Sequence, residues 1–226
     1  KFIDNLQGVD TNLSAIPGYF NYELGMLVCG NGFDYLRNLF YPNTPSYQIA
    51  EILKDVPVGS NGVMIMPNFY KEKAFQLDGN RLMDILSLSA EVQAPDVLNS
   101  YLESVVCEFS EQINHISDKT NFPADRIVLE VSLSTLTPFT DILTSILSAS
   151  VFRPASFEAA IYGAWINVAV ISGHMDNYED ALGAVHQQIQ AEAFANHDHA
   201  YGEYRRAVKN YQAKQENKRK YVEENV

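Results

Sequence analysis

Ser156-Phe157-Glu158-Ala159-Ala160-Ile161-Tyr162-Gly163-Ala164-Trp165 begins a segment that continues through apolar residues to Ile171 and ends at Ser172-Gly173. We expect this segment to form a buried helix. Ser156 is a suitable N-cap, Glu158 complements the positive end of the helix dipole, and Gly173 can take the left-handed conformation that ends a helix. Short side chains share one side at helical spacing, which lets another backbone or a bound group approach closely. These residues are Ala160, Gly163, Ala164 and Asn167.

The segments around this helix alternate between strand-like and helix-like patterns. The expected strands are residues 19–28, 63–66, 127–131 and 151–152, and the expected helices are residues 32–40, 47–53, 95–116, 138–147 and 178–194. The run at 127–131 is apolar except for Glu130, as in a central buried strand, whereas residues 68–93 are irregular. Alternating strands and helices predict an α/β fold in which helices cover a sheet.

Length and charge limit the classes of protein to which this chain can belong. A chain of 226 residues with 46% hydrophobic residues is long enough for one substantial core. We expect one domain over residues 1–200 and a basic helical tail over residues 201–226, which has seven Lys or Arg against four Asp or Glu. The net charge of −12 argues against a nucleic-acid partner, because such a partner requires a basic surface. No run approaches the ~20 apolar residues that span a bilayer, so no membrane partner is expected.

The cysteines and histidines of the sequence do not have the spacing of a metal site or a disulfide motif. Cys29 and Cys107 lack the spacing of a zinc or redox motif, and they predict free buried thiols in a reducing cytoplasm. The segment His197-Asp198-His199 offers two histidines without a further ligand and is interpreted as a solvated loop. The sequence therefore predicts a cytoplasmic protein without a structural metal.

Five segments together resemble the C-terminal half of the FGGY carbohydrate kinases, a family that includes xylulokinase, ribulokinase and glycerol kinase. Their order and spacing follow the family from about residue 15 to the end of the chain. The segments are Pro17 to Leu36 with Cys29-Gly30-Asn31-Gly32, Gly59-Ser60-Asn61-Gly62 leading to Pro67, Tyr101-Leu102-Glu103, Glu158-Ala159-Ala160 to Ala164, and Tyr178-Glu179-Asp180-Ala181.

This resemblance implies a ribonuclease-H-like fold of the actin and hexokinase type. In the family, Mg-ATP lies in a cleft between this half and an N-terminal half, and a sugar or polyol hydroxyl receives the γ-phosphoryl group. The catalytic Asp and most sugar contacts of the family lie upstream of the region matched here. We therefore expect a fragment with no catalytic residue of its own, with the N-terminal half and a sugar or polyol substrate as partners and with possible homo-oligomers. An actin-like ATPase outside the sugar kinases is a weaker alternative.

The resemblance also implies that Gly30 and Asp34 contact nucleotide. Gly30 corresponds to the family glycine that approaches the phosphates at a helix N-terminus, where free N–H groups favour anions. Asp34 lies one turn on, at the position of a nucleotide-contacting residue, although a carboxylate near phosphates is unfavourable unless a metal intervenes. A turn glycine and a solvated Asp are the plainer alternative, and both interpretations remain open.

Val131 and Ser132 stand where the family has a Gly-Gly pair that lets the backbone approach the nucleotide. Val131 is β-branched and disfavours a positive φ, so this turn should be strained or rebuilt. Ser104 and Leu82 also replace family glycines, and Ile146 replaces an Asp. The alternative function is therefore a non-catalytic relative that acts as an interaction or regulatory subunit.

Three further side chains have structural interpretations. Glu103 is expected to be a structural carboxylate that bonds backbone in the core, in preference to a catalytic group. Trp165 is expected to belong to the core. The pair Glu72-Lys73 resembles the Glu-Arg pair near the family's substrate cleft, although a solvated charge run is the simpler interpretation.

Overall fold

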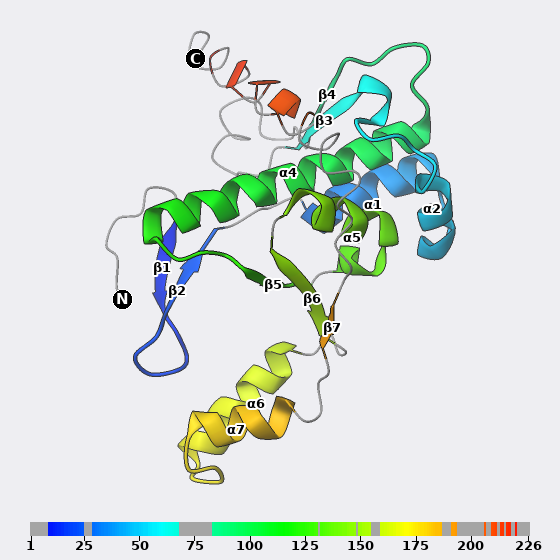
Figure 1. Cartoon of the computed structure of the whole chain (residues 1–226). Coiled ribbons are helices and arrows are strands. Elements are labelled where there is room, and N and C mark those ends of the chain that lie inside the picture. The colour runs from blue at the N-terminus through cyan, green and yellow to red at the C-terminus, as the bar shows by residue number, and fades with distance from the viewer. Residues whose placement is uncertain are drawn as a thin grey trace. The chain divides into compact units, whose positions relative to one another are not determined.

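The computed structural model describes residues 9–24, 29–67, 83–130, 132–147, 149–154, 159–186 and 191–193, together with positions 206, 209–211, 213–214, 216–217 and 220 of the tail. The described residues form a mixed α/β structure (Figure 1). Contacts group the chain into two compact units: the first is Lys1–Leu24, Asn114–Val131 and Ala149–Phe194, and the second is Gly25–Ile113, Ser132–Ser148 and Ala195–Val226. The predicted domain boundary at residue 200 stays a prediction, because the residues next to it lie outside the described part.

The first unit contains two small sheets and a helical hairpin. Its elements are β1 (Asp10–Leu13), β2 (Phe20–Glu23), β5 (Arg126–Val128), β6 (Ser150–Pro154), β7 (Ala191–Ala193), α6 (Ala159–Ile171) and α7 (Tyr178–His186). Strands β1 and β2 pair antiparallel, and the second sheet has the order β5-β6-β7. Strand β6 pairs parallel with β5 and antiparallel with β7.

The prediction of a central buried strand at 127–131 is wrong. Strand β5 is only three residues long and lies at the edge of its sheet, where 55% of Val128 is exposed. The helix expected over 178–194 is also shorter, since α7 ends at His186 and residues 191–193 pair with β6. In both places pairing between distant segments decides the structure, and local pattern does not report it.

Helix α6 confirms the expected helix and its stop, but it is not buried. Gly173 has φ 73°, the left-handed conformation that ends the helix, while the predicted cap at Ser156 and Glu158 lies outside the described residues. Ile166 and Ala169 are buried, yet Trp165 is 40% and Ile171 is 80% exposed. The core position predicted for Trp165 is therefore wrong. The helix is apolar around its circumference, so the sequence pattern could not show which side packs.

Gly163 leaves open space on this helix. A Cβ built at Gly163 meets no atom within 4 Å. Because alanine is the better helix former, we expect Gly163→Ala to raise the free energy of unfolding by about 0.5–1 kcal/mol, measured by chemical denaturation. A loss of stability would mean that another part of the protein approaches this face closely.

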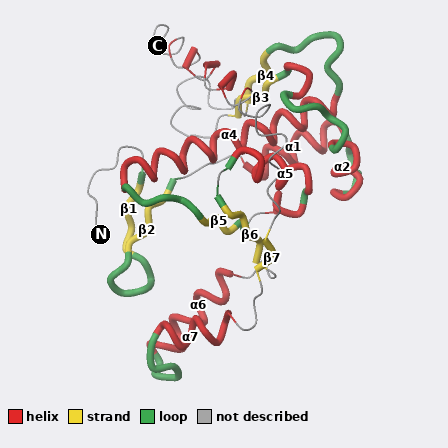
Figure 2. The backbone as a smooth tube through the Cα atoms, in the orientation of Figure 1, coloured by secondary structure: helices red, strands yellow, loops and turns green. Residues whose placement is uncertain are grey.

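The second unit is built around the long helix α4, which Figure 2 shows as one continuous rod. Its elements are α1 (Cys29–Phe40), α2 (Ser46–Leu53), η1 (Ser60–Gly62), β3 (Met64–Pro67), β4 (Met83–Leu86), α4 (Ala94–Thr120), η2 (Ser132–Thr135) and α5 (Thr137–Ile146). Helix α4 continues into the first unit from Asn114. The predicted helices and the strand after Gly62 are confirmed, whereas β4 forms within the segment 68–93 that was expected to be irregular.

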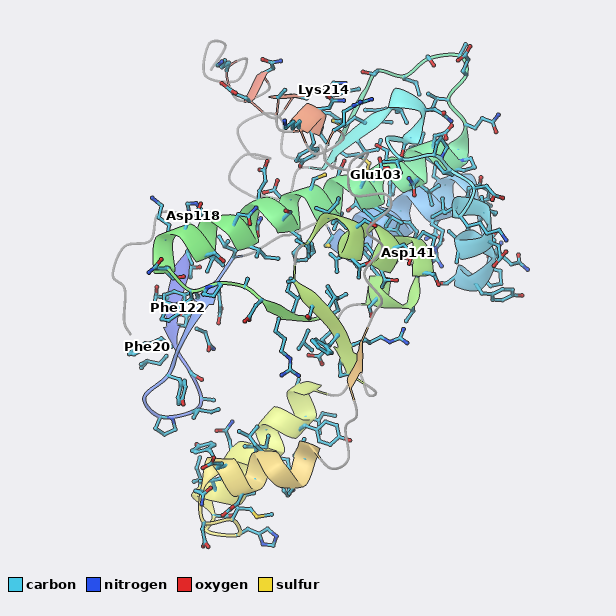
Figure 3. All side chains as sticks on the ribbon, viewed as in Figure 1. Phe20, Glu103, Asp118, Phe122, Asp141 and Lys214 are labelled. Carbon is cyan, nitrogen blue, oxygen red and sulfur yellow. The ribbon has the colours of Figure 1, made fainter. Side chains whose placement is uncertain are left out.

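The core of the second unit includes a side chain from the tail. Tyr211 is buried and packs with Met66 and Cys107, and its hydroxyl donates to Glu108 Oε2 at 3.2 Å. Lys214 Nζ donates to Ser87 Oγ at 2.6 Å. Tyr211 therefore attaches the tail to α4, and Lys214, which is labelled in Figure 3, attaches it to the residue that follows β4. Both cysteines are free, but only Cys107 is buried as predicted, and Cys29 is half-buried.

Candidate nucleotide-side helix and its supporting turn

The first turn of α1 carries two of the predicted site residues. Helix α1 begins at Cys29, so Gly30 lies in its first turn and is half-buried, while Asp34 lies one turn further on. The N–H groups of a first helical turn have no partner within the helix, and together with the helix dipole they favour an anion. Gly32, Phe33 and Leu36 form the buried side that attaches α1 to the unit.

Tyr101 of α4 fixes the position of this turn. Its hydroxyl donates to the backbone carbonyl of Cys29 at 2.8 Å, and its ring is fully buried. Burial raises the pKa of Tyr101, so the hydroxyl keeps its proton and remains a donor. A Cβ at Gly32 would lie 2.2 Å from Tyr101 Oη, so only glycine allows this close approach. The sequence motif at Tyr101 thus orients the N-terminus of α1.

Asp34 is exposed and has a cationic neighbour. Its Oδ1 lies 3.3 Å from a guanidinium nitrogen of Arg37, and 57% of its side chain is exposed. An ion pair whose carboxylate is exposed contributes little to stability at this spacing. Its effect on the site is electrostatic, since Arg37 offsets part of the negative charge that Asp34 places near the first turn of α1.

The structure does not test the other half of the predicted site. Val131 lies outside the described residues, and Ser132 begins η2 while its side chain is not described. Gly30 and Asp34 are brought together on α1, but whether the turn at 131–132 joins them stays a prediction. Glu72, Lys73 and the His197 to His199 segment also lie outside the described residues.

A left-handed turn precedes β3. The φ angles are 81° at Gly59, 49° at Ser60, 50° at Asn61 and 86° at Gly62. Backbone bonds run from Gly62 N to the Gly59 carbonyl and from Val63 N to the Ser60 carbonyl. A left-handed turn costs about 1–2 kcal/mol for each residue that is not glycine, so Ser60 and Asn61 need compensating contacts.

Helix α4 supplies those contacts from one face. Glu103 Oε1 accepts from Gly59 N at 2.8 Å, and its Oε2 accepts from Ser60 Oγ at 3.0 Å. Asn99 Nδ2 donates to Ser60 Oγ at 3.1 Å, and Asn61 Nδ2 donates to Asp96 Oδ1 at 2.9 Å. The three helix residues are spaced at i, i+3 and i+7 and therefore share a side of α4. Sequence reasoning missed Asp96 and Asn99, although this spacing opposite a Gly-x-x-Gly turn is a usable signal.

Glu103 is the structural carboxylate that the sequence predicted. Only 6% of the residue is exposed, and it accepts a backbone hydrogen bond in the core. Burial raises the pKa of its carboxyl group from 4.5 to about 7, although the bonds from Gly59 and Ser60 act in the opposite direction. The carboxyl group therefore changes its charge near neutral pH.

Two serines of α4 hold the strand that follows the turn. Ser100 Oγ accepts from Ile65 N at 2.8 Å, and Ser104 Oγ donates to the Ile65 carbonyl. Ser104 stands where the resembling family has glycine, and here its hydroxyl has a structural role on β3. This substitution therefore belongs to the packing of the strand.

Among the described residues, no three His, Cys, Asp or Glu side chains gather as a metal site requires. None of the helices in the described ranges combines the length and apolarity needed to cross a membrane.

Comparison with known proteins supports the fold. The sequence matches no protein-family model and no curated protein. The structure is similar to xylulose kinase from Rhodospirillum rubrum, with a TM-score of 0.78 and 18% identity over 96% of this chain and 43% of that one. It is also similar to Plasmodium falciparum glycerol kinase with ADP, with a TM-score of 0.69 and 14% identity over 97% and 42% of the two chains. Gluconate kinase from Lactobacillus acidophilus gives 0.68 and 13% identity over 83% and 38%.

These structural neighbours are carbohydrate kinases of the kind that the sequence motifs resemble. The chain spans about two fifths of the length of each of the three kinases. Identities below a fifth establish shared architecture and leave activity to be tested. The chain has the fold of a portion of the FGGY-type carbohydrate kinases.

Proposed function

We propose that this chain is the C-terminal, nucleotide-side part of an ATP-dependent sugar or polyol kinase with a ribonuclease-H-like fold. The observation that carries the proposal is the likeness to xylulose kinase over 96% of the chain. An N-terminal half of the same protein would supply the catalytic Asp and most substrate contacts. We expect the protein to act in the cytoplasm.

In this proposal the first turn of α1 receives a phosphate of the nucleotide. Its free N–H groups, the missing side chain at Gly30 and the helix dipole suit an anion. Tyr101 keeps the turn in place, and Arg37 reduces the repulsion between Asp34 and phosphate. Mg-ATP supplies the transferable γ-phosphoryl group when it is bound, and this part of the protein contributes positioning and electrostatic stabilisation.

The second candidate function is a non-catalytic relative that acts as an interaction or regulatory subunit. The sequence Val131-Ser132-Leu133-Ser134 favours it, because no glycine is present where the family's backbone approaches the nucleotide. In that case the packing of the fold would be kept while the phosphate turn is lost.

An activity assay on the full-length protein separates the two candidates. The kinase proposal expects ATP-dependent phosphorylation of at least one member of a panel of ketoses, aldonates and polyols, detected as ADP release. Activity on none of them, with a folded protein that binds no ATP in a separate titration, would support the regulatory candidate.

Asp34→Asn tests the electrostatics of α1. We expect the affinity for Mg-ADP to rise by about threefold, because a negative charge near the phosphates is removed while the side-chain shape is kept. The free energy of unfolding should change by less than about 0.5 kcal/mol, since the Asp34 carboxylate is exposed. Calorimetric titration of the full-length protein measures the affinity. A weaker affinity would mean that Asp34 instead contacts a metal or a nucleotide donor.

A further inference from the structure

Helix α6 carries an apolar stripe along the side opposite to its buried residues. Ile166 and Ala169 are buried, whereas the side chains of the stripe are exposed. The stripe consists of Ile161, Ala164, Trp165, Val168 and Ile171. Apart from Trp165, its members are spaced by three, four and three residues, which is the spacing of a coiled-coil seam. The sequence of α6 contains no charged residue, so the whole stripe is uncharged.

The stripe and the groove beside it have nearly the area of a dimer interface. At about 150–250 Å² for a large side chain, the four large side chains of the stripe expose on the order of 500 Å² together. Helices α6 and α7 lie side by side (Figure 1). Trp165 lines an open groove of about 450 Å³ with Ala184 and Val185 of α7, so the apolar surface continues beyond the stripe. A stable dimer buries about 800 Å² on each partner, and exposed apolar patches of this size are often interaction sites.

We propose that the stripe is the contact surface between two copies of this chain, which pack α6 against α6 in antiparallel orientation. A two-fold axis requires a surface that matches itself, and the spacing of this stripe is the same from either end of the helix. With the axis level with Ile166, Ile161 of one copy lies opposite Ile171 of the other. Ala164 then lies opposite Val168, and the short side chain leaves room for the larger one. The antiparallel order also places the N-terminus of one helix beside the C-terminus of the other, so the helix dipoles attract.

The charges around the stripe favour a second copy over a lipid surface. A helix that lies on a membrane carries Lys or Arg on its polar side, and α6 carries neither. The exposed residues Asp176, Glu179 and Asp180 follow it in the chain. Together with the net charge of −12, these carboxylates repel an anionic lipid surface. An uncharged stripe is best covered by another uncharged surface, which a second copy supplies.

Sedimentation velocity of the full-length protein at micromolar concentrations tests this interface, and the test does not depend on kinase activity. We expect the unmodified protein to sediment as a dimer. Val168→Glu should raise the dissociation constant of the dimer at least 100-fold, because each dimer would then bury two unpaired carboxylates. Leu88→Glu is the matched control, since Leu88 is 65% exposed and Val168 is 64% exposed, but Leu88 lies in the loop after β4. It should remain a dimer.

Mixing two charged variants separates a lost interface from a misfolded protein. Val168→Lys should be monomeric by itself, and an equimolar mixture with Val168→Glu should form dimers again. The two positions lie about 6 Å apart along the paired helices, because each is two residues from the axis. Three results would each overturn the proposal: a monomeric unmodified protein, a dimer that survives Val168→Glu, or a mixture that stays monomeric.

Discussion

Replacing Glu103 by alanine is expected to lower the free energy of unfolding by about 3 kcal/mol at pH 6. The substitution removes an acceptor from Gly59 N, Ser60 Oγ and Asn99 Nδ2, all in the interior of the second unit. Each buried donor left without a partner costs about 1–3 kcal/mol, although Ser60 and Asn99 still bond each other. The loss falls on a turn that already contains two residues in an unfavourable conformation. Urea denaturation at fixed pH measures it.

The stability that Glu103 contributes should fall as the pH rises. The pKa of Glu103 is about 7 in the folded protein and near 4.5 when unfolded, so the folded state binds the proton more tightly. Stability from this group is therefore present below about pH 4.5 and is lost as pH rises through 7, at about 1.4 kcal/mol per pH unit between those values. Carboxylates that are paired in the native state show the opposite trend.

Glu103→Gln separates the charge from the hydrogen bonds. Glutamine has the same shape, accepts from Gly59 N and cannot ionise, so it should cost less than about 1 kcal/mol at pH 5.5. At pH 8.5 it should be more stable than the unmodified protein, which carries a buried charge there. Equal pH slopes for the two proteins would contradict the assignment of this titration to Glu103.

Gly32→Ala is expected to destabilise the protein by about 2–3 kcal/mol and to disturb the first turn of α1. The added Cβ would lie 2.2 Å from Oη and 2.7 Å from Cζ of Tyr101, whose ring is fully buried. Overpacking of a rigid core typically costs 1–3 kcal/mol, and displacement of Tyr101 also removes its bond to the Cys29 carbonyl. Denaturation measures the stability, and Mg-ADP titration measures the effect on the proposed site.

Two further variants test whether the close contact between Gly32 and Tyr101 causes the loss of stability. Gly163→Ala makes the same substitution on α6, where space is open, and should be stabilising. Tyr101→Phe removes only the hydroxyl and should cost about 1 kcal/mol. If Gly32→Ala were as harmless as Gly163→Ala, the close contact between α1 and α4 would not exist in solution.

Much of the fold could be predicted because local patterns dominate there. The apolar spacing at 32–40, the proline near the start of α4 and the glycines at 59 and 62 each act within a few residues. Strand β4, the edge position of β5 and the early end of α7 depend on pairing between distant segments. The exposed face of α6 could not be predicted, because an apolar helix gives no direction to its packing.

Only some residues of the candidate site could be predicted from the sequence. Gly30 at a helix N-terminus and Glu103 as a core carboxylate followed from the sequence and its resemblance. The turn held by Asp96, Asn99 and Glu103 required the structure, because it joins segments more than 30 residues apart. The structure also showed that Gly32, and not only Gly30, limits the approach of α1 to α4.

The most direct test of the account is titration of Mg-ADP into the full-length protein beside a Val131→Gly, Ser132→Gly variant. The kinase proposal predicts that the unmodified protein binds Mg-ADP and that Gly32→Ala, which displaces the first turn of α1, weakens the affinity at least tenfold. No binding by the unmodified protein, together with binding by the double-glycine variant, would contradict it and would indicate a kinase fold that has lost its nucleotide site.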